Sequence, residues 1–359
     1  MSENALSNSQ IRKLTLVTEF EQRDFFQWLI ALDNHKEELN VEMSSVIASS
    51  SHRRRIDLND PYWNPIRNAD FVFVYVTRME RSIEWWMLPQ FVKSLMRPDA
   101  KMIVQYDDEF MWLFHPETTW WDYPNPPNTG PEQFFRDSGI LEIPDAHLCV
   151  MDNSLFKPYT SKPVYQLMLP HLNRYNLEKY SLEHKMNNIA ILIHSSHQAS
   201  IQNSIDNVIK VKNYPLTIFS NKSRTSGVNY CRDNNLPVGS RAFGLIPRES
   251  FVDLLWQFSS IALDDNVNYI GWSRFVMECA ITYVPCIGST DAVKILFPEL
   301  YTAPQDYAKQ IELIEKLRTD KKFYQNIAKT GHERCMDHFN EGELCKKLIK
   351  FFEGEGNAK

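Results

Sequence analysis

Short apolar runs alternate with amphipathic stretches along the first half of the chain. A run rich in Val, Ile and Phe is typical of a strand buried on both faces, and helices between such strands indicate an α/β protein with parallel sheets. The strands expected in this half are 14–17, 45–48, 71–76, 102–105, 147–151 and 165–169. The clearest helices between them are expected at 25–39 and 83–96.

A second alternation of the same kind begins near residue 189, after a polar stretch. Its expected strands are 189–193, 216–220, 261–264 and 284–288, and its expected helices are 201–210, 248–258 and 273–282. From residue 305 onward the pattern is helical and amphipathic. The sequence therefore predicts a first α/β domain over 1–170, a linker over 171–186, a second α/β domain over 187–335, and a C-terminal helix and tail over 336–359. Because ligands of such folds bind where parallel strands end, a cleft between the two domains is the expected site.

Composition agrees with a folded protein of two domains. The chain has 359 residues, 43% of them hydrophobic and 13% aromatic, which is enough for sizeable cores. No apolar run approaches the roughly 18 residues that span a bilayer, and residues 1–10 do not read as a signal peptide, so a cytoplasmic protein is expected. The six cysteines form no CxxC pair, so we expect reduced thiols.

The charge is spread unevenly between the two halves. Residues 1–165 contain 16 Lys and Arg against 24 Asp and Glu, while the remainder contains 23 against 21. A net charge of −8 argues against a general nucleic-acid surface on the first domain. The value of +2 for the rest suits an anionic ligand better.

The most specific stretch of the sequence is 266–289, which reads NVNYIGWSRFVMECAITYVPCIGS. Gly271 and Ser273 can start a helix, and Pro285 ends the turn that follows it. The free N–H groups and the dipole at a helix N-terminus favour a phosphate, and Arg274 can add a charge-assisted hydrogen bond. This stretch is therefore a candidate phosphate site.

The same stretch resembles the nucleotide-sugar site of GT-B glycosyltransferases, most nearly the family 4 (glycosyl transferases group 1) type. The preceding segment, 244–265, and an earlier run that begins KMIVQYDDEFMW at residue 101 are similar to the corresponding parts of that family, in the same order. The resemblance covers residues 100 to 350. It implies a GT-B fold of two Rossmann-like domains facing each other across a cleft, with an acceptor domain over 1–170 and a nucleotide-sugar domain over 187–335.

The resemblance also implies roles for single residues of the second domain. Glu278 would hold the ribose hydroxyls of the donor nucleotide; the alternative is an ordinary helix with a solvated glutamate. The diphosphate or the sugar would be lined by Gly271, Trp272, Ser273 and Arg274.

Two positions of the second domain depart from the family pattern. Ile270 stands where a second glutamate is usual, eight residues before Glu278. Ser195, in ILIHSSHQAS, stands where a basic pair is usual. Arg241, close to Gly244, is the nearest replacement cation. Ser195, Arg241 and Gly244 therefore complete the expected donor site.

Carboxylates follow the expected strand 102–105 in the first domain. Asp107 and Asp108 would orient or deprotonate an acceptor hydroxyl, or hold a divalent cation against the diphosphate. A solvated acidic turn is the alternative. His115 would contact the transferred sugar, or else pack in an aromatic loop.

Other polar groups of the sequence carry weaker predictions. His332, Cys335 and His338 would share one face of a helix and lack a fourth ligand for zinc, so we expect them to pack structurally. The basic run 52–55 could steer an anionic acceptor, but a solvated loop is the favoured interpretation. Thr18 and Glu19 stand where the family has a glycine-rich loop.

The function implied by the resemblance is transfer of a sugar from a nucleotide-sugar donor, with a UDP-sugar favoured, to an acceptor hydroxyl of a glycan, lipid-linked or small molecule. It implies retention at the anomeric carbon, no cofactor and no required metal, with a divalent cation optional. Three alternatives stay open: a glycosyltransferase acting on a hydroxymethylated base in DNA, as in phages; a nucleotide-sugar epimerase; and a non-catalytic GT-B scaffold. The run 52–55 favours a DNA acceptor, and the acidic first domain opposes it.

Overall fold

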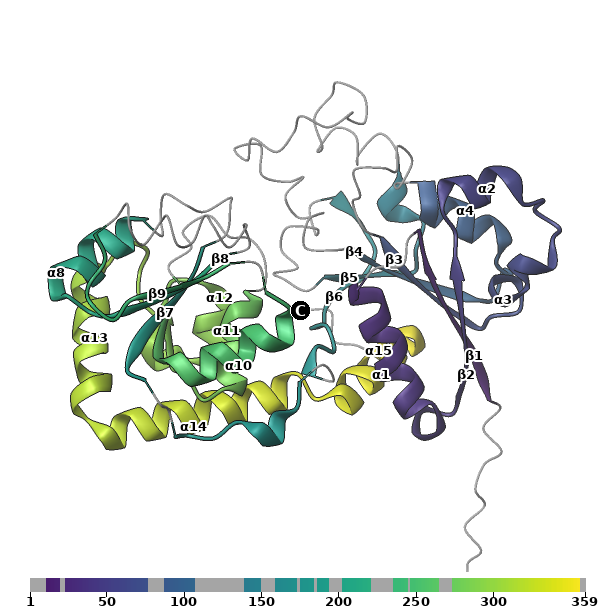
Figure 1. Cartoon of the computed structure of the whole chain (residues 1–359). Coiled ribbons are helices and arrows are strands. Elements are labelled where there is room, and N and C mark those ends of the chain that lie inside the picture. Colours follow the sequence, from purple (N-terminus) through teal and green to yellow (C-terminus); the bar gives the residue numbers. More distant parts are fainter. Residues whose placement is uncertain are drawn as a thin grey trace, which may run out of the picture. The chain divides into compact units, whose positions relative to one another are not determined.

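The computed structural model describes residues 11–19, 23–76, 87–106, 139–149, 159–172, 175–183, 186–193, 202–220, 235–244, 246–264 and 273–355 (Figure 1). The chain forms two compact units, the first from residues 1–173 and 339–359 and the second from residues 174–338. Each unit is built around one parallel sheet.

The sheet of the first unit contains six parallel strands within the described residues, in the order β2-β1-β3-β4-β5-β6. They are β1 (Arg12–Thr18), β2 (Val41–Ile47), β3 (Phe71–Val76), β4 (Lys101–Tyr106), β5 (Ala146–Cys149) and β6 (Val164–Gln166). Strand β3 is buried along its whole length, as its unbroken apolar run predicts. The strand order reverses between β1 and β3, so Thr18 and Val76 mark the edge where this type of sheet binds ligands.

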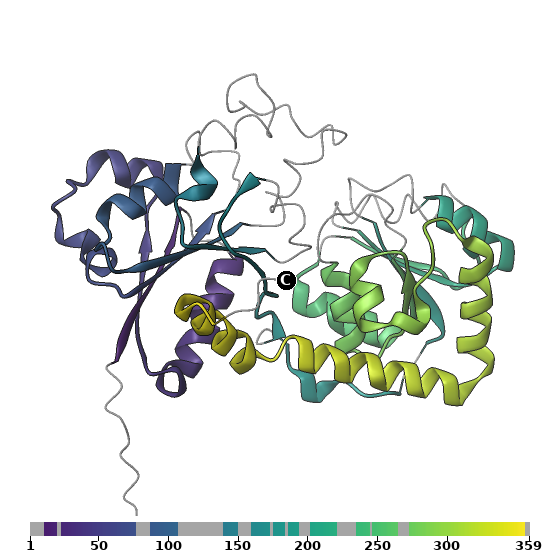
Figure 2. The same ribbon diagram turned by 180° about the vertical axis from the view of Figure 1, so that it is seen from behind.

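Helices lie on both faces of this sheet (Figure 1, Figure 2). On one face are α1 (Arg23–Leu39) and α15 (Glu341–Glu353), and on the other are α2 (Ser50–Arg55), η1 (Pro61–Trp63), α3 (Asn64–Arg67) and α4 (Leu88–Leu95); the short helix η4 (Ile140–Glu142) precedes β5. Trp28 of α1 packs edge-on against Phe73, with ring centroids 5.5 Å apart. Phe352 of α15 stacks on Phe71 at 4.7 Å. Aromatic side chains of β3 thus anchor both helices.

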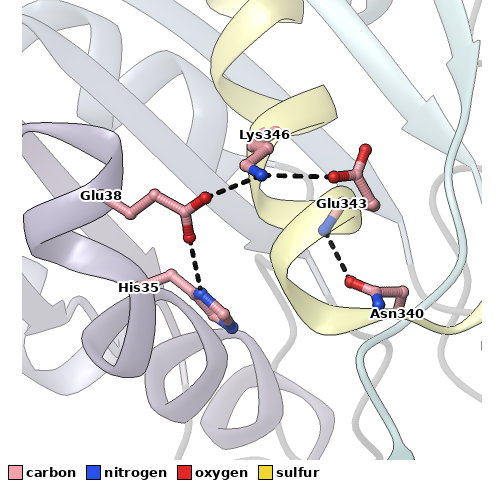
Figure 3. A network of polar contacts seen from close by, with 5 residues as sticks. All are labelled: His35, Glu38, Asn340, Glu343 and Lys346. Carbon is pink, nitrogen blue, oxygen red and sulfur yellow. Dashed lines mark hydrogen bonds and ion pairs between the residues drawn. The ribbon is translucent and has the colours of Figure 1, made fainter.

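The chain returns to the first unit through α15, which lies beside α1 (Figure 3). Asn340 caps the helix, because its Oδ1 accepts a hydrogen bond from the backbone N–H of Glu343 at 3.0 Å. Lys346 Nζ lies 2.7 Å from Glu38 Oε1 of α1, and His35 Nδ1 lies 3.2 Å from Glu38 Oε2. Exposed ion pairs contribute little to stability, so the buried apolar face of α15 carries most of its docking.

The sheet of the second unit contains five parallel strands within the described residues, in the order β11-β10-β7-β8-β9. They are β7 (Asn188–Ile193), β8 (Leu216–Ser220), β9 (Arg241–Phe243), β10 (Ser259–Asp264) and β11 (Cys286–Gly288). Here the strand order reverses between β7 and β10. Ile193 and Asp264 therefore mark the edge of this sheet where a ligand is expected.

The helices of the second unit pack through aromatic side chains. They are η8 (Leu177–Lys179), η10 (Ile205–Ile209), α8 (Lys210–Lys212), α10 (Arg248–Phe258), α11 (Arg274–Ile281), α12 (Asp291–Leu296), η11 (Pro298–Leu300), α13 (Tyr307–Thr319) and α14 (Lys321–His338). Phe251 of α10 packs edge-on against Phe219 of β8 at 4.6 Å. His332 of α14 stacks on Tyr283, just after α11, at 4.1 Å. Helix α11 is thereby held between α10, the sheet and α14.

Candidate functional site

The carboxylate of Glu278 lies inside the second unit. Residues 275–281 of α11 are all buried, and the side chain of Glu278 has no exposed surface. Tyr175 Oη donates a hydrogen bond to Glu278 Oε1 at 2.7 Å. Removing a carboxylate from water costs free energy unless hydrogen-bond donors surround it. The alternative of a solvated glutamate on this helix is therefore wrong.

The start of α11 follows the residues expected to bind phosphate. The helix begins at Arg274 after Ser273, whose side chain makes no capping hydrogen bond and is buried. The first N–H groups of α11 are thus not taken by the Ser273 hydroxyl, as a site for an anion at a helix N-terminus requires. The backbone carbonyl of Ser273 accepts from the N–H of Val276 at 3.1 Å.

Strands β10 and β11 end in close contact at the carboxyl edge of the second sheet. Thr290 Oγ1 donates to Asp264 Oδ2 at 2.9 Å, which ties the residue before α12 to the end of β10. A Cβ atom on Gly288 would lie 2.2 Å from the backbone oxygen of Asp264. A glycine is therefore required at this position by the close approach of two backbones.

The substitution Gly288→Ala should lower the free energy of unfolding by about 2 kcal/mol, because the strands must separate to admit the methyl group. Urea unfolding measures the change. The matched control is Gly342→Ala on α15, where the new Cβ would lie 3.1 Å from Cε1 of the His35 ring. This ring is partly exposed and can shift, so the control should change stability by less than about 1 kcal/mol. Equal effects of the two substitutions would contradict the close approach at Gly288.

Arg241 and Gly244 lie at and after strand β9. Arg241 pairs in register with Thr217, near the amino end of β8, and its guanidinium lies 4.8 Å from the Phe258 ring centroid. Ser220 ends β8 three residues beyond Thr217, so Arg241 lies about 10 Å from the carboxyl edge. Arg241 thus lies on the edge strand, away from the carboxyl edge, and Gly244 is buried just after the end of β9. Their roles stay predictions.

Six of the predicted site residues lie outside the described residues. They are Asp107, Asp108, His115, Ser195, Gly271 and Trp272. Strand β4 ends at Tyr106 and β7 ends at Ile193, so the segments that carry Asp107 and Ser195 follow the carboxyl ends of strands in the chain. Their roles stay predictions.

A buried ion pair lies at the end of β1 in the first unit. Arg53 pairs with Glu19, and their side chains are 8% and 0% exposed. The guanidinium of Arg53 also lies 6.0 Å from the Phe91 ring centroid. The expectation of a loop over 52–55 is wrong, because these residues belong to α2. Arg54 and Arg55 are exposed as expected, whereas the side chain of Arg53 points inward. Arg53 is one of the basic residues of the run 52–55 that favoured a DNA acceptor, and its charge is paired with that of Glu19.

Polar side chains form a row across the carboxyl edge of the first sheet. Thr18, Tyr75 and Gln105 are register partners on β1, β3 and β4, and all three residues are buried. Trp28 Nε1 donates to Gln105 Oε1 at 2.7 Å. The sequence pattern did not predict this row, although a threonine, a tyrosine and a glutamine at the ends of apolar strands indicate it.

The cluster His332, Cys335 and His338 belongs to α14. Burial lowers the pKa of His332, and its Nδ1 lies 3.3 Å from the Ala280 carbonyl oxygen. Cys335 is fully buried, with its thiol 3.9 Å from the Met277 carbonyl oxygen. Both residues pack α14 against α11, which confirms the structural interpretation for them.

The described part of the chain contains neither a metal-binding cluster nor a membrane-spanning helix. Within it, no group of three or more His, Cys, Asp or Glu side chains is placed to hold a metal ion. No helix in the described ranges is long and apolar enough to cross a membrane. Each cysteine described, namely Cys149, Cys279, Cys286, Cys335 and Cys345, is a buried thiol outside any disulfide bond.

A scan against protein-family models and a search of curated proteins found no match to this chain. Solved structures match it over nearly its whole length. A glycosyltransferase from Rickettsia africae is 11% identical with a TM-score of 0.64, over 98% of this chain and 100% of the other. A sucrose-phosphate synthase from Thermosynechococcus elongatus is 12% identical with a TM-score of 0.61, over 95% and 98%. Anabaena HepE, solved with UDP-glucose, is 8% identical with a TM-score of 0.59, over 95% and 99%.

These matches extend through both units and both parallel sheets. The chain has the GT-B fold. Structural matches at such low sequence identity show the fold alone. They confirm the two Rossmann-like units predicted from the sequence. In a Rossmann-like unit of the GT-B fold, ligands bind at the strand ends where the strand order reverses. In this chain those ends are at β1 and β3 in one unit and at β7 and β10 in the other.

Proposed function

We propose that this chain is a glycosyltransferase that moves a sugar from a nucleotide-diphosphate sugar, with a UDP-sugar favoured, to an acceptor hydroxyl. The observation that carries the proposal is the buried, hydrogen-bonded carboxylate of Glu278 on the helix that follows β10 in a GT-B fold. HepE, which was solved with UDP-glucose, shares this fold and supports the choice of donor.

The donor would be held by the second unit. The Glu278 carboxylate would accept hydrogen bonds from the two ribose hydroxyls, as charged acceptors bind hydroxyl groups strongly. The N–H groups at the start of α11, with Ser273 and Arg274, would hold the diphosphate. The predicted contacts of Gly271, Trp272 and Ser195 would complete this site.

The acceptor would be held by the first unit. An acceptor with several hydroxyl groups, such as a glycan, would lie near the carboxyl ends of β1 and β3, where the strand order reverses. Asp107 or Asp108 would take the proton of the attacking hydroxyl, and His115 would contact the sugar. The bond from the anomeric carbon to the diphosphate breaks as the bond to the acceptor oxygen forms, and we propose retention at that carbon.

Catalysis would come from positioning and electrostatics. Both substrates are fixed before reaction, which converts a bimolecular step into a nearly unimolecular one. The departing diphosphate carries a large negative charge, and the α11 N-terminus with Arg274 would stabilise it as it forms. These tasks need no resident cofactor.

The substitution Glu278→Gln should raise KM for the UDP-sugar about 30-fold, because two hydrogen bonds to the ribose lose their charged acceptor. Release of UDP from UDP-glucose, UDP-galactose and UDP-N-acetylglucosamine, with and without simple glycosides, measures turnover. The matched control is Glu315→Gln, since Glu315 also accepts a hydrogen bond from a tyrosine, Tyr214, in the same unit.

The control should leave KM unchanged. A wild-type protein that releases no nucleoside diphosphate from any of these donors would contradict the proposal and favour a non-catalytic scaffold. Turnover that is insensitive to Glu278→Gln would remove Glu278 from the donor site.

A further inference from the structure

Tyr175 connects the first described segment of the second unit to Glu278. Its hydroxyl donates to Glu278 Oε1 at 2.7 Å, although the two residues are 103 positions apart in the chain. The exposed fractions are 8% for Tyr175 and 0% for Glu278. The polar composition around Tyr175 predicts only an interdomain linker, so this contact is visible only in the structure.

The segment 175–183 is fixed to α10 by three further contacts. Lys179 Nζ lies 2.6 Å from Asp253 Oδ2, and Tyr180 Oη donates to Asp253 Oδ1 at 3.1 Å. Trp256 Nε1 donates to the Ser181 carbonyl oxygen at 3.0 Å. Burial and the Asp253 carboxylate raise the pKa of Tyr180, so this hydroxyl stays a donor. The Tyr175 side chain is thus presented from an anchored segment.

We propose that Tyr175 is a positioning residue of the nucleotide site: its hydroxyl fixes the orientation of the Glu278 carboxylate toward a vicinal diol of the ligand. This inference rests on the proposed function, in which Glu278 binds the ribose. A carboxylate offers about four acceptor positions, enough in number for the Tyr175 hydroxyl and for the two donors of a diol. A neutral hydroxyl leaves the negative charge in place, and a pre-oriented acceptor loses less conformational entropy when the ligand binds.

The test compares ligands with and without the diol. Wild-type protein, Tyr175→Phe and Tyr180→Phe are titrated by calorimetry with UDP and with 2′,3′-dideoxyuridine diphosphate, well below the unfolding temperature of each protein. The matched control Tyr180→Phe removes the hydroxyl of a tyrosine in the same segment that is likewise 8% exposed, but this hydroxyl is bonded to Asp253. Tyr175→Phe retains the ring, and its unfolding temperature is recorded alongside.

We expect Tyr175→Phe to weaken UDP binding about 10-fold and to leave the dideoxy ligand unaffected. The control should bind both ligands as the wild type does.

A merely structural role would lower the unfolding temperature without changing the ratio of the two affinities, and that result would overturn the inference. If the wild type prefers UDP and Tyr175→Phe prefers it equally, Tyr175 has no positioning role and the donor site stands. If the wild type binds both ligands equally, Glu278 does not read the ribose, and the inference falls with that part of the proposed function.

Discussion

Replacing Arg53 with alanine should lower the free energy of unfolding by about 3–5 kcal/mol. The guanidinium pairs with Glu19 at the end of β1, and the two side chains are 8% and 0% exposed. When one partner of a buried pair is removed, the other charge stays buried without it, which costs more than the intact pair contributes. Urea unfolding followed by circular dichroism measures the loss.

The neighbouring substitution Arg55→Ala provides the control for this effect. Arg55 is exposed on the same short helix, α2, so its removal should change stability by less than about 0.5 kcal/mol. A double variant, Glu19→Gln with Arg53→Met, should recover part of the loss, because no unpaired charge remains buried. Similar small losses for Arg53→Ala and Arg55→Ala would contradict the burial of the ion pair.

Acidification should destabilise the protein through His147 on β5. The imidazole is fully buried, its Nε2 donates to the Leu141 carbonyl oxygen at 2.7 Å, and burial lowers its pKa to about 4. Above pH 6.5 the ring is neutral in both states, and its contribution is fully present. Between pH 6.5 and pH 4, His147 becomes protonated in the unfolded chain but stays largely neutral in the folded protein. The free energy of unfolding should therefore fall by about 3 kcal/mol across this window.

The variant His147→Gln isolates this contribution from those of the carboxylates and of His332. Gln retains a donor for the Leu141 carbonyl oxygen but does not titrate. Free energies of unfolding at pH 7 and pH 4.5 should therefore differ by about 2–3 kcal/mol less in the variant than in the wild type. Identical pH dependence of the two proteins would show that His147 accepts a proton in the folded state.

The sequence predicted those elements whose apolar runs are complete. Strands β3 and β8 and helix α10 have the expected bounds, since unbroken burial or a clear amphipathic period defines them. Strand β9 was missed because it has three residues and starts with the exposed Arg241. Helix α2 was missed because SSHRRR has no apolar period; a Ser49 cap and the ion pair of Arg53 hold it instead.

The part of the candidate site that lies within one short stretch of sequence could be predicted, and the long-range contacts could not. Glu278 lies within a local motif, so its place on a helix after a strand could be predicted from spacing. Its partner Tyr175 could not, because a contact over 103 residues depends on how the chain folds and leaves no local pattern. The row of Thr18, Tyr75 and Gln105 likewise depends on the register of three strands.

The most direct test of the central claim is calorimetric titration of the wild-type protein and Glu278→Gln with UDP, GDP, ADP, CMP and dTDP. We predict that one nucleoside diphosphate, UDP, binds the wild type selectively and binds Glu278→Gln about 30-fold more weakly. Absence of binding by all five nucleotides to the folded wild-type protein would contradict the assignment of a nucleotide-sugar donor site to the second unit.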